Sequence, residues 1–238
     1  MHKTYHFKSL SSTQEKAKEL AKEGVDNSIV IAETQTKGRG RFGRKWISGK
    51  GGLWMSIAMK QKKTGNLQFL TFAAAVSVVK SIKKLTGLQT KIKWPNDVHY
   101  KAKKLCGILT EGKFGRENRV VIGIGLNVNQ DNFPDNIKDV STSLKIIKKK
   151  NYDLQDLASS ISSEFFRLYK FYEKSKFGKI LDSWKKNCDT IGKDVTVITS
   201  TNTFKGTAIG IDENCSLLLK LSNNKITKII EGDLKVRY

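Results

Sequence analysis

The 238-residue chain has few prolines, few cysteines and few acidic residues, and it has no long apolar run. Its three cysteines form no CxxC pair and its three histidines lack metal-ligand spacing, which argues against a disulfide framework and a zinc site. No segment approaches the roughly 20 apolar residues that span a bilayer, and the N-terminus carries no secretory signal. We therefore expect a soluble, reduced, cytoplasmic protein with no membrane partner.

The charge of the chain is strongly unbalanced. It carries 44 Lys and Arg against 22 Asp and Glu, a formal net charge of +22. A lysine-rich soluble surface explains much of this, and a nucleic-acid-binding module is the alternative. One region differs, because no acidic residue stands between Glu33 and Asp97. This gap suggests that an anion binds there or that an anionic partner docks.

The residue patterns predict a large domain followed by a small one. Predicted helices cover residues 12–23, 67–85, 153–172 and 178–186, and predicted strands cover 28–34, 52–59, 91–94, 104–114 and 119–128. Ser12 and Glu15 have capping-box spacing, with the Ser12 hydroxyl expected on the amide of residue 15. After residue 187 come short strands separated by turn signals, so we predict domains 1–187 and 188–238, the second packed on the first.

The loop Gly38–Gly43 reads GRGRFG, a literal G-x-G-x-x-G. It fails as a dinucleotide fingerprint because no helix opens after it and no acid follows until Asp97. Arg39, Arg41 and Arg44 instead offer forked donors for phosphate or carboxylate. Such a loop can close over a polyanion and exclude water. A solvated turn or a basic nucleic-acid patch is an equal alternative for this loop alone.

Three further segments carry chemistry only in combination. Residues 93–97 (KWPND) place Asn96 and Asp97 at a strand end, Lys104 begins an apolar strand, and residues 123–129 (GIGLNVN) put glycine on alternate strand positions. A strand face without side chains lets a flat ligand come close. Taken singly, these segments read equally as a turn, a surface lysine and a bulged strand.

Together and in this order, the series GRGRFGRKW, KWPNDV, KKLCGILTE and GIGLNVN resembles the biotin protein ligase family. The Ser-Thr-Gln of residues 12–14 is similar to a polar triplet of that family, with Gln14 where many relatives have Asn. The resemblance covers residues 10–235 and implies an α+β fold, with a mixed-sheet catalytic domain and a C-terminal SH3-like domain. It also implies a short form without the N-terminal DNA-binding domain of longer members.

The activity implied by the resemblance has two steps. Biotin and Mg-ATP give biotinyl-5′-AMP, and biotin then passes to a lysine of a biotin carboxyl carrier protein of acetyl-CoA carboxylase. The implied catalytic residues are Lys104 and Arg41. The implied biotin-binding residues are Ser12, Thr13, Gln14, Gln35, Arg39, Gly40, Arg41, Lys104 and Gly107. The implied ATP-binding residues are Arg39, Arg41, Arg44, Trp46, Asn96, Asp97 and Asn127.

The sequence leaves several points open. A lipoate ligase shares the implied fold and adenylate chemistry, although GRGRFGRKW and KWPNDV favour biotin. A basic nucleic-acid-binding module is the rival from another class, and it leaves the KWPND and GIGLNVN segments unexplained. The magnesium ligands are unknown, and a homodimer is as compatible with the sequence as a monomer.

Overall fold

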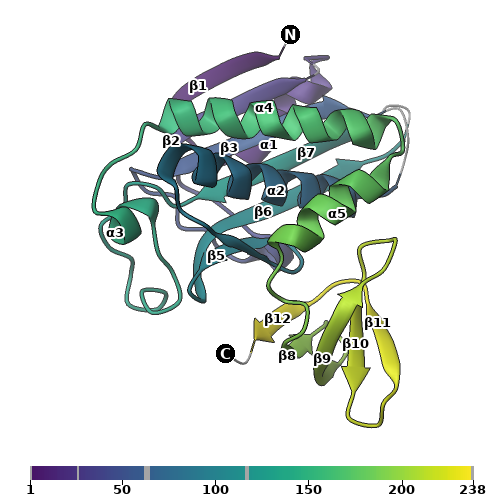
Figure 1. Ribbon diagram of the computed structural model, residues 1–238. Helices are drawn as coiled ribbons and strands as arrows, with labels where there is room; N and C mark the ends of the chain where they lie inside the picture. Colours follow the sequence, from purple (N-terminus) through teal and green to yellow (C-terminus); the bar gives the residue numbers. More distant parts are fainter. Residues whose placement is uncertain (1, 26, 62–64, 116–117, 237–238) are drawn as a thin grey trace.

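The computed structural model describes residues 2–25, 27–61, 65–115 and 118–236, which form a mixed seven-stranded sheet, flanking helices and a separate five-stranded sheet (Figure 1). The larger sheet has the order β1-β2-β3-β7-β6-β5-β4. Strands β1 and β2 are parallel and all the other neighbours are antiparallel. The strands are β1 (Lys3–Leu10), β2 (Ser28–Gln35), β3 (Leu53–Lys60), β4 (Lys91–Lys93), β5 (Asp97–Tyr100), β6 (Lys103–Lys113) and β7 (Arg119–Leu126).

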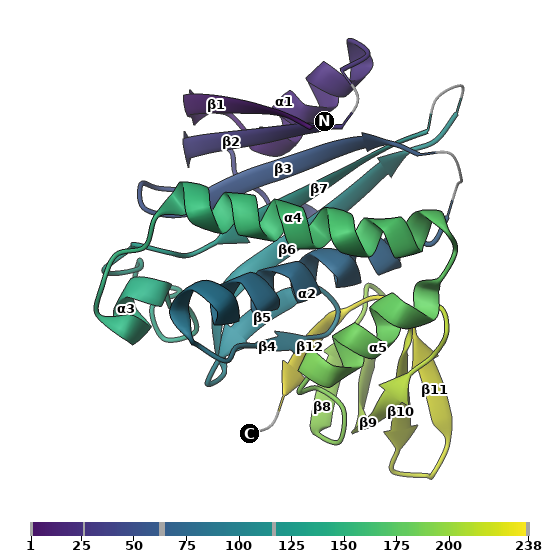
Figure 2. The same ribbon diagram turned by 45° about the horizontal axis from the view of Figure 1, so that its top comes forward.

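The two faces of this sheet are covered unequally. Helices α2 (Leu67–Thr86), α4 (Leu154–Glu173) and α5 (Phe177–Asn187) lie on one face (Figure 2), where Ile57 and Ile122 belong to the main core. The neighbouring residues Ala58 and Val121 point to the other face, where the short helix α1 (Thr13–Lys22) packs on them. Successive strand residues alternate between faces. Gly123 and Gly125 therefore share the α1 face with Val121.

The small C-terminal sheet is antiparallel, with the order β11-β10-β9-β8-β12. Its strands are β8 (Asp194–Ile198), β9 (Thr203–Ile211), β10 (Leu217–Leu221), β11 (Ile226–Ile229) and β12 (Asp233–Val236). Trp94 joins this sheet to the larger domain, because its buried indole Nε1 donates to the Cys215 carbonyl at 3.1 Å. The apolar residues on the α2 face of the larger sheet and those of the small sheet form one continuous core.

The predicted α+β class, with a mixed sheet and a small all-β domain, is confirmed. The predicted domain boundary falls at the end of α5, ahead of β8. The patterns missed β1, β5, β12 and the five-residue helix α3 (Leu144–Lys148). Residues 116 and 117, between the predicted strands 104–114 and 119–128, lie outside the described residues. Within the described chain, no helix is both long and apolar enough to cross a membrane.

The capping box predicted for α1 is wrong in its partners. The Ser12 hydroxyl accepts from the amide of Gln14 at 3.2 Å, one residue earlier than expected. The Glu15 carboxylate turns outward instead and pairs with Lys18 and Arg39. The helix is thus capped by serine alone, and Glu15 is released for a contact with the glycine–arginine loop.

Candidate functional site

A cavity of about 940 Å³ opens on the sheet face that α2 and α4 leave uncovered. Its floor comes from β3, β6 and β7, and its sides from the loop after β2, residues 93–97, residues 133–141 and the start of β12. All fourteen residues singled out in the sequence line it: Ser12, Thr13, Gln14, Gln35, Arg39, Gly40, Arg41, Arg44, Trp46, Asn96, Asp97, Lys104, Gly107 and Asn127. Segments far apart in the chain therefore meet in one hollow.

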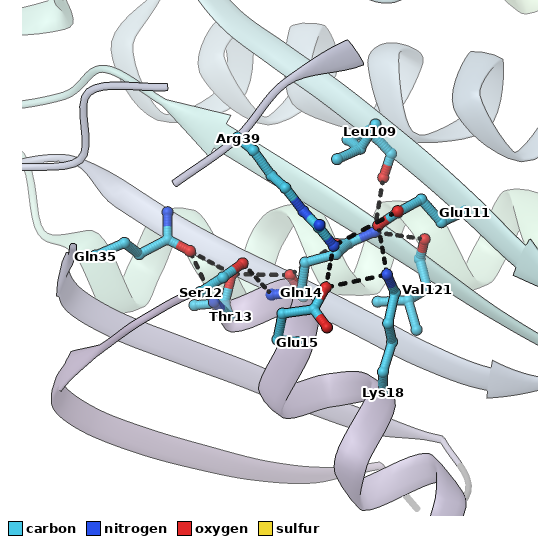
Figure 3. Close-up of polar contacts among 11 residues, drawn as sticks. Ser12, Thr13, Gln14, Glu15, Lys18, Gln35, Arg39, Leu109, Glu111 and Val121 are labelled. Atoms are coloured by element: carbon cyan, nitrogen blue, oxygen red, sulfur yellow. Dashed lines mark hydrogen bonds and ion pairs between the residues drawn. The ribbon is translucent and has the colours of Figure 1, made fainter. Parts of the chain in front are cut away.

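Hydroxyl and amide groups gather at the α1 end of the cavity (Figure 3). The Gln14 amide nitrogen donates to the carbonyls of Leu109 and Val121 at 3.3 and 3.1 Å. Its oxygen accepts from Ser56 Oγ at 3.1 Å. Gln14 is thus anchored across β6 and β7, and its amide hydrogens are directed at backbone carbonyls.

The proton of Ser56 fixes the direction of the next hydrogen bond. Thr13 Oγ1 lies 2.8 Å from Ser56 Oγ, and each hydroxyl has one proton to give. Since Ser56 gives its proton to Gln14, Thr13 does not accept from Ser56. The one Thr13 hydroxyl proton goes to Ser56 Oγ or to Gln35 Oε1, which lies 3.0 Å away. Gln35 Oε1 accepts from the backbone amide of Thr13 at 2.7 Å. The Thr13 oxygen then keeps lone pairs for a ligand N–H group.

Glycines leave the strands in the middle of the cavity floor without side chains. A Cβ on Gly125 would lie 2.5 Å from Trp46 Nε1, and one on Gly107 would lie 3.1 Å from the same indole ring. A Cβ on Gly123 would lie 2.5 Å from the Gln14 side-chain oxygen. The bare strand face predicted from the alternate glycines is therefore present. Trp46 and Gln14 lie directly against it.

Arg39 points to the α1 end of the cavity. Its guanidinium contacts the Glu15 carboxylate and lies 3.6 Å from Glu111 Oε1 on β6 (Figure 3). Lys18 lies 3.1 Å from Glu15 and 3.0 Å from Glu111, so the cluster holds two cations and two carboxylates. Neither Glu15 nor Glu111 was identified from the sequence as part of the site, because their partner belongs to a distant loop.

The opposite end of the cavity is cationic. Lys104 Nζ lies 2.7 Å from Asp97 Oδ1 and 5.2 Å from the centre of the Trp46 ring. Arg41 donates to Asn96 Oδ1 at 3.2 Å and to the Gly232 carbonyl at 3.3 Å. Burial lowers the pKa of the Arg41 guanidinium, opposed by nearby carboxylates that include Asp233. A partly desolvated arginine of this kind attracts an anion more strongly than a solvated one.

The C-terminal domain contributes a wall that the sequence did not identify. Arg44 forms an ion pair with Asp233 at the start of β12, and this hydrogen bond raises the pKa of Arg44. Together with the bond from Arg41 to the Gly232 carbonyl, this pair ties the glycine–arginine loop to the second domain. In the sequence, Asp233 is one of several acidic residues near the C-terminus, and no local pattern marks its pairing with Arg44.

Asn127 directly follows β7 and lines this end of the cavity. It is buried, and its amide donates to the Thr142 carbonyl at 3.1 Å. That bond places residues 133–141 along the cavity, with Lys104 and Ser141 bridged in parallel. The described residues contain no group of three His, Cys, Asp or Glu side chains that could hold a metal ion. Asp97 and Asp233 are the acidic residues among the described cavity walls.

Comparison with known proteins assigns both domains. Residues 6–129 match the model of the "Biotin/lipoate A/B protein ligase family", and residues 190–235 match "Biotin protein ligase C terminal domain". The chain is 40% identical over 245 residues to the "Bifunctional ligase/repressor BirA" of Bacillus subtilis, covering 99% of this chain and 74% of that protein. It is 26% identical to a "Biotin--[acetyl-CoA-carboxylase] ligase" of Paracoccus denitrificans, covering 88% and 90%.

The fold has a close counterpart among solved structures. The biotin protein ligase from Aquifex aeolicus in complex with biotin and ATP superposes with a TM-score of 0.88 at 30% identity. The match covers 99% of this chain and 98% of that one. Both domains therefore have a counterpart in a single related chain.

Proposed function

We infer that the two ends of the cavity have different tasks, because this chain belongs to the biotin/lipoate A/B protein ligase family and is an ATP-dependent biotin–protein ligase. One observation carries the proposal. A polar end built by Thr13, Gln14 and Gln35 shares a single hollow with a cationic end built by Arg41 and Lys104, and a glycine floor lies between them. Such a cavity suits a vitamin head group at one end and a polyphosphate at the other.

The α1 end binds the biotin head group. The free lone pairs of Thr13 Oγ1 accept from a ureido N–H, and Ser12 and Gln35 complete the polar rim. Gln14 acts through Ser56, because its amide hydrogens are used by backbone carbonyls. The fused rings of biotin lie against Trp46, whose indole rests on Gly107 and Gly125 because a side chain at either position would collide with it.

The cationic end carries the first chemical step. A biotin carboxylate oxygen attacks the α-phosphorus of ATP, and the bond from that phosphorus to the bridging oxygen breaks, so that pyrophosphate leaves with the electron pair. The two reactants repel each other because both are anions. Lys104 and Arg41 offset this repulsion and the charge that develops at phosphorus, as preorganised donors do in other active sites. Asn96 and Asn127 border the nucleotide side.

Magnesium would be held mainly by the ATP phosphates. This ion needs only one or two protein carboxylates when phosphates supply the other oxygens. The cavity fits that requirement, since Asp97 is the carboxylate beside Lys104 and no metal cluster is present among the described residues. Asp97 would hold the ion, which supplies neutralisation of the polyphosphate charge.

The glycine–arginine loop protects the product of this step. Biotinyl-5′-AMP is a mixed anhydride that water hydrolyses, so a closed site retains it. Gly40, Arg41 and Arg44 line the cavity. Arg41 and Arg44 bind the C-terminal domain through Gly232 and Asp233. The second domain therefore serves as the surface on which the loop closes.

The second step transfers biotin to a lysine of a carrier domain. The neutral ε-amine attacks the anhydride carbonyl, AMP leaves, and the amine loses a proton. We propose the biotin carboxyl carrier protein of acetyl-CoA carboxylase as the acceptor, in line with the name of the Paracoccus relative. An acidic carrier domain would be attracted by the net charge of +22. The free cysteines and the use of ATP suit the cytoplasm.

An exchange assay tests the proposed substrate. The purified chain is incubated with Mg-ATP and labelled pyrophosphate, with either biotin or lipoate. Biotin should drive label into ATP, and lipoate should not. Exchange that depends on lipoate would show that lipoate, and not biotin, is the substrate, and it would leave the proposed adenylate chemistry in place. Tight binding of nucleic acid that needs no ATP and weakens steeply with salt, without exchange, would overturn the assignment.

A further inference from the structure

The charged cluster around Arg39 contains two positive and two negative side chains. Arg39 belongs to the glycine–arginine loop, Glu15 and Lys18 to α1, and Glu111 to β6 (Figure 3). The two carboxylates balance the two cations, so the cluster adds no net attraction for an anionic ligand. Its members come from three separate elements, and its geometry ties the loop to the sheet and to the helix that begins with Thr13.

The direction of the Arg39 side chain separates it from the other loop arginines. Arg41 and Arg44 reach toward Asn96 and Asp233, at the nucleotide end. Arg39 reaches toward Glu15 and Glu111, at the other end. The loop is thus fastened at both ends of the cavity, by the C-terminal domain on one side and by two carboxylates on the other.

We propose that Glu15 and Glu111 are positioning residues that hold Arg39 and thereby fix the glycine–arginine loop over the biotin end of the cavity. The proposal deepens the function proposed above and rests on it. Glu15 is available for this role because it does not reach back to cap its own helix. Glu111 lies one strand position from Thr110, whose side chain packs toward α2 through Thr71. Alternation therefore directs Glu111 to the cavity face.

Loop protection in the free protein gives the direct measurement. Within the loop, the Gly40 amide donates to the Arg44 carbonyl at 2.7 Å and the Trp46 amide donates to the Gly38 carbonyl at 2.9 Å. Hydrogen exchange of the peptide that covers residues 38–46 reports on these bonds. In Glu15→Gln/Glu111→Gln the peptide should exchange about five- to tenfold faster, since exposed ion pairs each shift an equilibrium by roughly two- to fivefold.

Two comparisons separate positioning from general damage. Glu19→Gln removes the same charge from the same helix, where Glu19 pairs with Lys16 at 3.0 Å, and it should leave loop exchange unchanged. Arg39→Gln removes the cation and leaves the helix sequence intact. Loop exchange should rise in Arg39→Gln about as much as in the double glutamate variant, and combining all three changes should add little.

Salt provides a readout that a purely structural role would not move. Raising the ionic strength from about 0.01 to 1 M shortens the screening length from about 30 to about 3 Å. Loop exchange in the unaltered protein should accelerate over this range. In the double glutamate variant the acceleration should be smaller, and what remains comes from the Arg44–Asp233 pair. With biotin and ATP present, the variant should also release biotinyl-5′-AMP about five- to tenfold faster in a trapping assay.

The outcomes are distinct. Unchanged loop exchange in the double glutamate variant, or a salt response equal to that of the unaltered protein, would overturn the proposal. If α1 itself loses protection in that variant, the Arg39→Gln variant becomes the test. Loop exchange in Arg39→Gln that is as slow as in the unaltered protein would also overturn the proposal. The exchange measurements need no substrate. A negative result in the pyrophosphate assay would therefore refute the proposed function without affecting this test.

Discussion

Lys104 Nζ lies 2.7 Å from Asp97 Oδ1, across the antiparallel pair of β5 and β6. The contact aims a half-buried ammonium group into the cavity and identifies Asp97 as its counter-charge. Removing the lysine would subtract one positive charge and expose one negative charge at the place where two anions must meet.

Lys104→Ala should therefore lower the rate of biotinyl-5′-AMP formation by about 10²–10³, the usual effect of losing one preorganised charge-stabilising donor. Stability should change by less than about 1 kcal/mol, because the pair is partly exposed. Single-turnover formation of the adenylate and a thermal melt measure the two effects. Lys103→Ala, at the exposed neighbouring position, is the control. Near-normal adenylate formation in Lys104→Ala would remove the residue from its assigned role.

Much of the fold could be predicted because its long elements are strongly patterned. Helices α2 and α4 begin and end within one or two residues of the predicted ranges, since each has an extended apolar face. Strand β1 was missed because it is an edge strand with a mostly exposed, polar sequence. Strand β5 and helix α3 are too short to establish a period, and tertiary contacts stabilise them.

The site could be predicted to the extent that its residues lie in local motifs. The glycine–arginine loop, the KWPND turn and the alternate glycines all border the cavity, and each is visible over a few residues of sequence. Ser56, Glu111 and Asp233 were missed because they belong to ordinary strands. Their roles come from partners on other elements, and no local pattern reports such a pairing.

Arg41→Gly should loosen the closed loop. Arg41 holds both Asn96 and the Gly232 carbonyl, and glycine offers no side chain for either contact while adding backbone freedom. We expect biotinyl-5′-AMP to escape at least about tenfold faster, measured by mixing preformed enzyme–adenylate complex with a chemical trap. Lys37→Gly makes the same kind of change at an exposed position ahead of the loop and should retain the adenylate. Equal retention in both variants would count against loop closure through Arg41.

Gly123→Ala should weaken biotin binding more than it impairs folding. The added Cβ would lie 2.5 Å from the Gln14 oxygen, so Gln14 must move and Ser56 loses its acceptor. The Michaelis constant for biotin should rise about tenfold, since a rearranged hydrogen bond of this kind costs about 1–3 kcal/mol. Steady-state kinetics with biotin as the varied substrate measure the change.

Gly178→Ala is the matched control for that substitution. Gly178 lies on α5. Apart from its chain neighbours and the backbone of its own helix, no described atom lies within 4 Å of the position that an alanine methyl group would take there. Alanine should therefore leave the kinetics unchanged and favour the helix. An unchanged Michaelis constant for biotin in Gly123→Ala would show that Gln14 does not organise the Thr13 hydroxyl through Ser56.

Asp189→Asn should lower stability at neutral pH. Asp189 follows α5, with its carboxylate 2.8 Å from His99 Nε2 and 3.0 Å from Lys193 Nζ. Burial raises the pKa of Asp189, but the hydrogen bonds and charges of His99 and Lys193 outweigh it and hold the pKa below its usual value. A carboxyl with a depressed pKa stabilises the fold above the unfolded-state value of about 3.9 and loses that contribution as pH falls through the folded-state value. Urea unfolding should therefore show a loss of about 1 kcal/mol at pH 7 and a smaller loss near pH 3. Asp182→Asn, on the exposed side of α5, should behave like the unaltered protein, and a deficit in Asp189→Asn that is equal at both pH values would contradict the electrostatic origin.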